Sequence, residues 1–123
     1  MKRALVILDH GSRLSEAHEH LLWLAESVRK RAPDLLVEIA HLEQAEPSLE
    51  QALARCARAG ATHVAVHPLF LTPGRHLGRD VPRLLEQARE NHAGLEIELL
   101  PSLGTQEALA DLILATLDPS RIR

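Results

Sequence analysis

Four short apolar runs alternate with four amphipathic stretches along this chain, and the alternation constrains its fold more than any other feature. The runs have the length of buried strands, and they lie at Ala4–Leu8, Leu35–Leu42, His63–Leu69 and Leu95–Leu100. Strict alternation of strands with helices predicts a parallel sheet, right-handed crossovers and helices on both faces. We therefore predict a single α/β domain over residues 1–123, with a four-stranded parallel sheet of flavodoxin-like topology.

The amphipathic stretches carry apolar residues at helical spacing. Their apolar faces are Ala17, Leu21, Leu24, Ala25 and Val28; Leu49, Ala52, Leu53, Cys56 and Ala57; Val81, Leu84, Leu85 and Ala88; and Ala108, Leu109, Leu112 and Ile113. Capping chemistry predicts where these helices begin and end. The expected boundary residues are a capping box at Ser48 and Gln51, N-caps at Asp80 and Thr105, Pro82 in a first turn, and left-handed C-caps at Gly60 and Gly94.

Composition excludes several classes of protein. Hydrophobic residues make up 46% and charged residues 25% of the chain, which is the balance of a soluble globular domain. A net charge of −3, with one Trp, one Phe and no Tyr, gives neither the basic surface nor the stacking rings that bind nucleic acid. No apolar stretch approaches the roughly 20 residues that span a bilayer, so we expect a cytoplasmic protein without a membrane partner.

Histidine is abundant and cysteine is scarce, with eight His and one Cys in 123 residues. A single cysteine excludes an internal disulfide framework and any cysteine-rich zinc or iron–sulfur site within one chain. Any metal must therefore be held by imidazole and carboxylate groups. Cys56 lies on the apolar face of a predicted helix, so we expect it in the core.

Ligands bind open parallel sheets beyond the carboxyl ends of the strands. The loops expected at that edge are residues 9–13, 41–48, 68–76 and 101–102. The stretch from Thr72 to Asp80 is the longest without a helical or strand pattern, and such loops often carry function. The sequence contains no GxGxxG, GxxxxGK[ST] or GxSxG motif, so the usual nucleotide grips and the serine nucleophile elbow are missing.

His10 and His76 are the strongest candidates for chemistry, because each lies in a glycine-containing loop at this edge. Imidazole can ligate a borderline divalent metal or accept a proton near neutral pH, and the alternative for both residues is a loop-structuring role. Glu43 can ligate a metal, accept a proton, or simply pair with the N-terminus of the next helix. Arg13 and Arg75 flank the two histidines and suit an acidic substrate, with ordinary surface charge as the alternative.

The remaining histidines have weaker claims. We expect solvated side chains at His18 and His20, positions at element ends for His63 and His92, and a core position for His67. His41, at the end of a predicted strand, is kept as an outside candidate for the site.

Three motifs together resemble those of the class II tetrapyrrole chelatases, and specifically their short sirohydrochlorin cobaltochelatase form. The motifs are Asp9-His10-Gly11-Ser12-Arg13, Leu42-Glu43-x-x-Glu46-Pro47-Ser48 and the long stretch Pro68-Leu69-Phe70-Leu71-x-Pro-Gly-Arg-His76-x-x-x-Asp80-x-Pro82. The resemblance covers nearly the whole chain in order and spacing, and it implies a chelatase-like fold. It also implies ATP-independent insertion of Co²⁺ into sirohydrochlorin on the route to cobalamin.

By the same resemblance, His10 and His76 are the catalytic pair that handles the metal, and Glu43 is a third member. It implies no cofactor beyond the substrate metal ion, which is Co²⁺ with Fe²⁺ or Ni²⁺ as alternatives. It also implies a homodimer, because longer relatives carry two such domains in one chain. The residues expected to contact the tetrapyrrole are Gly11, Ser12, Arg13, Leu69, Phe70, Leu71, Gly74 and Arg75, with Leu77 as a further apolar wall.

Two other functions fit the same residues. Sirohydrochlorin ferrochelatases, whose reaction leads to siroheme, have a similar sequence. A non-catalytic carrier of metal or tetrapyrrole would use the same cleft without turnover.

Overall fold

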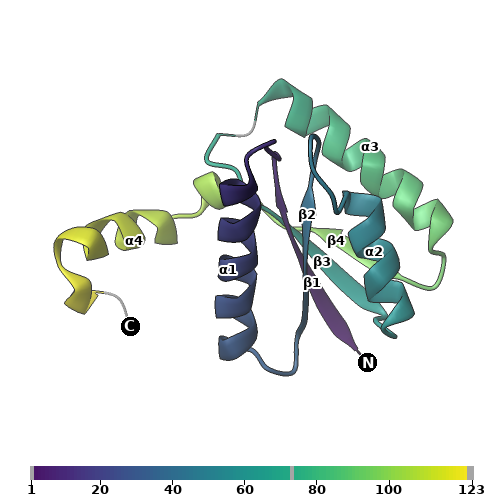
Figure 1. Cartoon of the computed structure of the whole chain (residues 1–123), viewed down its shortest axis with the longest axis horizontal. Helices are drawn as coiled ribbons and strands as arrows, with labels where there is room; N and C mark the ends of the chain where they lie inside the picture. The colour runs from purple at the N-terminus through teal and green to yellow at the C-terminus, as the bar shows by residue number, and fades with distance from the viewer. Residues whose placement is uncertain (1, 73, 122–123) are drawn as a thin grey trace.

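The four predicted strands form one parallel sheet in the computed structural model (Figure 1). They are β1 (Arg3–Asp9), β2 (Leu36–His41), β3 (His63–Pro68) and β4 (Glu96–Leu99), in the order β2-β1-β3-β4. The structure describes residues 2–72 and 74–121, and the side chains of residues 75, 76, 77 and 121 lie outside that description. The parallel pairing confirms the predicted α/β fold class.

Helices cover the two faces of the sheet unequally (Figure 1). One face packs against α1 (Ser15–Arg31), and the other packs against α2 (Leu49–Arg58) and α3 (Arg75–Asn91). The larger core lies under α2 and α3, where it includes Leu8, Leu53 and Leu85. Central strand β1 contributes alternate residues to both cores, which explains why its sequence is a continuous apolar run.

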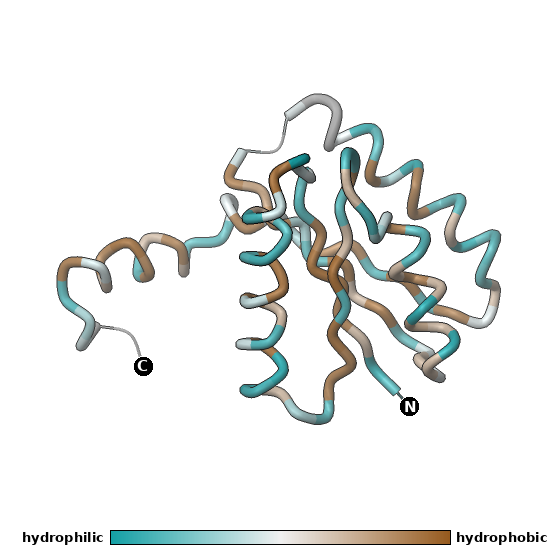
Figure 2. The backbone as a smooth tube through the Cα atoms, in the orientation of Figure 1, coloured by the Kyte–Doolittle hydropathy of each residue, from teal (hydrophilic) through white to brown (hydrophobic). Residues whose placement is uncertain are grey.

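The last helix, α4 (Ala108–Leu117), departs from the prediction. It extends away from the sheet at the edge of the molecule, and most of its residues are apolar (Figures 1 and 2). None of its residues is buried, so the predicted apolar face with Leu112 and Ile113 does not pack against the sheet in this chain taken alone. The predicted N-cap at Thr105 is also wrong, because Thr105 ends a short 3-10 helix (Leu103–Thr105) and Glu107 caps α4.

The other predicted boundaries divide into confirmed and wrong ones. Ser48 and Gln51 form the expected capping box, with Gln51 N–H donating to Ser48 Oγ at 3.1 Å. Gly60 has the expected left-handed backbone, with φ 91°. Gly94 lacks one, because α3 ends at His92, whose N–H bonds back to the Ala88 carbonyl. None of the described helices is long and apolar enough to cross a membrane.

Candidate active site

The carboxyl ends of three strands converge on one edge of the sheet, as the sequence predicts. The register pairs Asp9 with His41 and Leu8 with Pro68, so β1, β2 and β3 end side by side. The loops that follow them therefore leave the sheet at the same place. This edge carries the candidate site.

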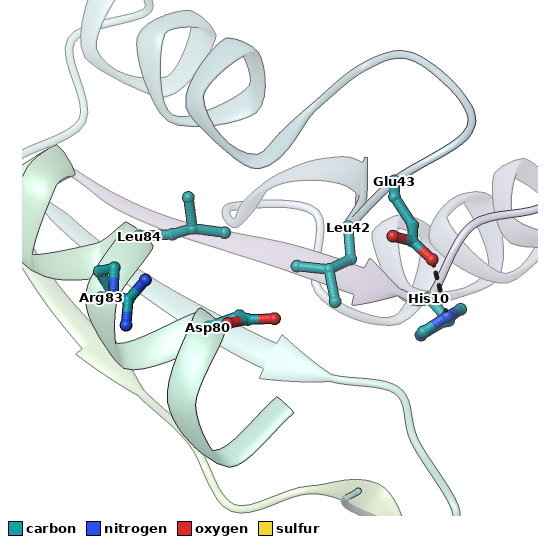
Figure 3. Close-up of a pocket in the computed structure, with 6 residues that line it drawn as sticks. All are labelled: His10, Leu42, Glu43, Asp80, Arg83 and Leu84. Atoms are coloured by element: carbon teal, nitrogen blue, oxygen red, sulfur yellow. Dashed lines mark ion pairs between the residues drawn. The ribbon is translucent and has the colours of Figure 1, made fainter. Parts of the chain in front are cut away.

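His10 and Glu43 face one another across two of these loops (Figure 3). His10 Nε2 lies 3.1 Å from Glu43 Oε1, and both side chains are more than half exposed. Backbone bonds hold the loops together beyond the strands, since the N–H of Glu43 donates to the His10 carbonyl at 3.1 Å. The structure thus brings together two of the three residues expected to perform the chemistry.

Gly11 is required by the contact between these loops. Its φ of 100° is in the left-handed region, which disfavours any residue with a Cβ. A Cβ built at this position would lie 1.8 Å from the Glu43 carbonyl oxygen. Gly11 therefore allows the loop that carries His10 to lie directly against the backbone of Glu43.

A cleft of about 410 Å³ opens beside this pair. Its lining residues are His10, Leu42, Glu43, Asp80, Arg83 and Leu84. The β1–α1 and β2–α2 loops provide the first three residues, and α3 provides the others (Figure 3). The cleft therefore has an imidazole–carboxylate pair at one end and both signs of charge on the opposite wall.

Helix α3 begins earlier than the sequence suggested. We predicted a loop from Thr72 to Asp80, an N-cap at Asp80 and Pro82 in the first turn, and all three predictions are wrong. Gly74 is the N-cap and the helix begins at Arg75, so Pro82 lies inside it. The combination of Gly78 and Pro82 obscured the helical pattern, because both residues are poor helix formers. As a result, position 76 falls in the first turn of α3.

Several predicted site residues lie outside the described part of the structure. These are the side chains of Arg75, His76 and Leu77, and Pro73 of the same motif also lies outside the described residues. For Gly74 the backbone is described, and its φ of −79° with no neighbour within 4 Å of a built Cβ gives no requirement for glycine.

The remaining residues predicted to contact a ligand have different surroundings. Phe70 is buried in the core under α2 and α3, with its ring centroid 6.5 Å from that of His10. Leu69 packs instead on the α1 side of the sheet, and Leu71 is 69% exposed. Ser12 Oγ accepts a hydrogen bond from the Leu14 N–H, and Arg13 is exposed. Phe70 thus lies edge-on to the ring of a catalytic candidate.

His41 and His18 are bonded to each other, which corrects our expectation for His18. His41 is buried, and its Nδ1 lies 2.6 Å from Asp9 Oδ1. Its Nε2 lies 2.9 Å from Nδ1 of His18, which is therefore not a freely solvated side chain. His20 is exposed as expected and stacks on Trp23.

The other histidines take structural positions. His63 opens β3 and pairs with Glu96 at 2.9 Å, and His92 at the end of α3 lies 2.7 Å from Glu50. His67 is half-buried rather than fully in the core, and burial lowers its pKa. Cys56 is fully buried as predicted, and loss of solvation raises the pKa of its thiol to about 11.

Two charged residues of the cleft, Asp80 and Arg83, were not predicted as site residues. Their signal is a spacing of one helical turn, because positions 76, 80 and 83 share a face when the helix begins before His76. Within the described part of the chain, no three His, Cys, Asp or Glu side chains come together as a metal-ligand group. His10 and Glu43 are thus two donors of a set that would need a further member.

Comparison with known proteins gives these residues a family context. The chain is 44% identical over 89 residues to a sirohydrochlorin cobaltochelatase of Methanocaldococcus jannaschii, covering 72% of this chain and 62% of that protein. It is 36% identical over 109 residues to the chloroplastic sirohydrochlorin ferrochelatase of Arabidopsis thaliana, covering 89% of this chain and 48% of that protein. The matched segments thus span less than two thirds of each of these relatives.

A solved structure shows the same fold. The sirohydrochlorin chelatase SirB of Bacillus subtilis subspecies spizizenii, in complex with cobalt, superposes with a TM-score of 0.83 and 28% identity, over 97% of this chain and 51% of SirB. The family model named CbiX matches residues 4–120. The chain therefore belongs to the CbiX family.

Proposed function

We propose that this protein is a sirohydrochlorin cobaltochelatase that inserts Co²⁺ into the macrocycle without ATP. The observation that carries the proposal is the His10–Glu43 pair at the mouth of a cleft, on loops that match family motifs. The relatives named as sirohydrochlorin chelatases support the substrate, and the cobaltochelatase at 44% identity supports the metal.

Insertion of a metal requires a ligand that releases it and a base that takes the two pyrrole protons. Neutral imidazole is a good ligand for borderline divalent ions, and a carboxylate is a good proton acceptor beside it. We assign the metal to His10 and His76, and proton acceptance to Glu43 or to a histidine. The 3.1 Å separation of His10 and Glu43 lets one group take a proton as the other engages the metal.

The walls of the cleft suit a flat acidic macrocycle. Leu42 and Leu84 supply apolar surface, and the Arg83 guanidinium can bind a peripheral carboxylate. Arg83 therefore joins Arg13 and Arg75 as a candidate contact for the acidic groups of the substrate. We also propose that the tetrapyrrole is contacted by Gly11, Ser12, Leu69, Phe70, Leu71 and Gly74.

The site assignment is tested by following the tetrapyrrole absorption spectrum during metal insertion. We expect His10→Ala and His76→Ala each to lower kcat by about 100-fold or more, since a positioned ligand or base contributes at least that much. His92→Ala is the matched control, because His92 also pairs with a glutamate but lies at the far end of α3. Unchanged rates in both folded site variants would sink the assignment.

The choice of metal is a separate test. Parallel rate measurements with Co²⁺ and Fe²⁺ under anaerobic conditions should give the larger kcat/KM with Co²⁺. A larger kcat/KM with Fe²⁺ would favour the ferrochelatase alternative. The 36% identity to the Arabidopsis ferrochelatase is the observation that supports this alternative.

We also propose that two copies of the chain associate. The chain matches 51% of SirB, so about half of that protein lies outside the matched part. In this chain, α4 exposes Leu112, Ile113 and Leu117 at 51%, 61% and 85%. A helix that exposes several large apolar side chains usually packs against another surface, and in this proposal a second copy of the chain provides that surface.

A further inference from the structure

A buried histidine lies directly behind the candidate site. His41 is 1% exposed and is the only polar or charged side chain that is buried among the described residues. Its two ring nitrogens are both engaged, one by Asp9 Oδ1 at 2.6 Å and the other by His18 Nδ1 at 2.9 Å. The three side chains join the ends of β1 and β2 to the first turn of α1.

The bonds assign the roles of the ring atoms. An ionised carboxylate only accepts hydrogen bonds, so His41 Nδ1 donates its hydrogen to Asp9. In the neutral ring Nε2 is then an acceptor, and His18 Nδ1 donates to it. Hydrogen bonds to both ring nitrogens fix the orientation of the His41 ring from two sides.

This hydrogen-bonded network lies at the bases of the two loops that carry His10 and Glu43. Asp9 immediately precedes His10, and His41 lies two residues before Glu43. Asp9 and His41 are register partners at the last position where β1 and β2 pair. The backbone N–H of His41 also donates to the Pro47 carbonyl at 2.8 Å, which closes the base of the loop that carries Glu43.

Packing alone does not explain a histidine here. A buried imidazole loses its hydration, and an apolar side chain of the same size would fill the space without that cost. Hydrogen bonds to a buried ring are directional, however, and they fix two loop bases relative to one another.

We propose that His41 is a positioning residue that, with Asp9 and His18, fixes the spacing between His10 and Glu43. The inference rests on the proposed function in one respect: it takes His10 and Glu43 as the side chains that bind the metal or accept the protons. It assigns no proton transfer to the network. His41 acts through the loops and does not line the cleft.

The test compares variants of His41 that differ in hydrogen bonding. His41→Phe removes both bonds, and we expect kcat to fall at least about 10-fold, as is typical when a supporting partner of a ligand is removed. The KM for sirohydrochlorin should stay within about twofold of the parent value, because Arg83 and Leu84, which line the cleft from α3, do not contact the His41 network. His41→Asn keeps a donor near the Nδ1 position and should recover most of kcat.

Two further variants keep the test decisive. His63→Phe removes another histidine–carboxylate pair, at the opposite edge of the sheet, and should leave kcat unchanged. If circular dichroism shows that His41→Phe does not fold, His18→Leu takes its place in the test. This variant removes only the bond between His18 and His41, so kcat should fall about threefold, less than when both bonds of His41 are lost.

The possible results separate the two proposals. Absence of turnover in the parent protein would count against the proposed function, and Co²⁺ titration of the protein alone then tests the positioning role. His41→Phe should weaken that Co²⁺ binding about 10-fold, while His41→Asn should not. Equal kcat, or equal Co²⁺ binding where turnover is absent, in the parent and folded His41→Phe or His18→Leu would overturn the inference.

Discussion

At the scale of single residues, the site depends on how each polar side chain is paired. His10 and Glu43 contact each other in an exposed position, which leaves both accessible to a ligand. His41, two positions before Glu43 in sequence, has both ring nitrogens engaged in the interior. The exposed pair of His10 and Glu43 is thus available for ligand contact, whereas the buried His41 holds the geometry of the loops in our proposal.

His67 gives a pH-dependent contribution to stability. Burial lowers its pKa below the ordinary value of 6.5, so the folded protein keeps it neutral where the unfolded chain takes up a proton. The unfolded state then binds more protons, and the free energy of unfolding decreases as pH falls below 6.5. Because glutamine does not titrate, the free energy of unfolding of His67→Gln should fall less than that of the parent when the pH is lowered from about 7.5 to about 5. Urea unfolding at both pH values measures this difference. A pH-independent difference between the two proteins would contradict this account.

The residue chemistry of the site was predictable only in part. His10 and Glu43 could be placed at one edge because parallel strands end together, and the structure brings them into contact. The partner of His18 could not be predicted, since helical spacing within α1 says nothing about a side chain that meets it from β2.

At the scale of elements, the loops after β1 and β2 depend on one glycine. Gly11 combines a left-handed φ with a contact to the Glu43 backbone that leaves no room for a Cβ. The strands and the first two helices followed from apolar spacing and capping residues. The start of α3 did not, because local propensity at Gly78 and Pro82 opposes a helix that the core nevertheless holds through Val81 and Leu85.

We therefore expect Gly11→Ala to be costly. The left-handed backbone and the clash with Glu43 should together lower the free energy of unfolding by at least about 2 kcal/mol, and chelatase activity should fall with it. Gly94→Ala is the control, since a Cβ at Gly94 meets nothing within 4 Å. Chemical denaturation of both variants measures the difference, and equal stabilities would refute the structural role of Gly11.

At the scale of the whole molecule, α4 is the element that a single chain does not accommodate. The helix that its sequence predicted is confirmed, but helical spacing cannot say which surface its apolar residues meet. In the described chain the helix extends away from the sheet with Leu112, Ile113 and Leu117 exposed (Figure 2). The proposed association of two copies would cover these exposed apolar side chains.

Ile113→Glu should weaken this association. A charge placed among apolar contacts between chains is costly to bury, so we expect the dissociation constant to rise about 10-fold or more. Gln87→Glu adds the same charge to an exposed position of α3 and should leave it unchanged. Sedimentation velocity over a range of concentrations distinguishes the two results, and a parent that sediments as a monomer throughout would refute the dimer.

The central claim is that this cleft catalyses metal insertion rather than merely holding metal or tetrapyrrole. The most direct measurement is the amount of cobalt-containing product formed when sirohydrochlorin and Co²⁺ are in large excess over the protein. We predict product well beyond one equivalent per chain, with the excess lost in His10→Ala. Product that stops at one equivalent per chain would contradict catalysis and would identify the protein as a carrier.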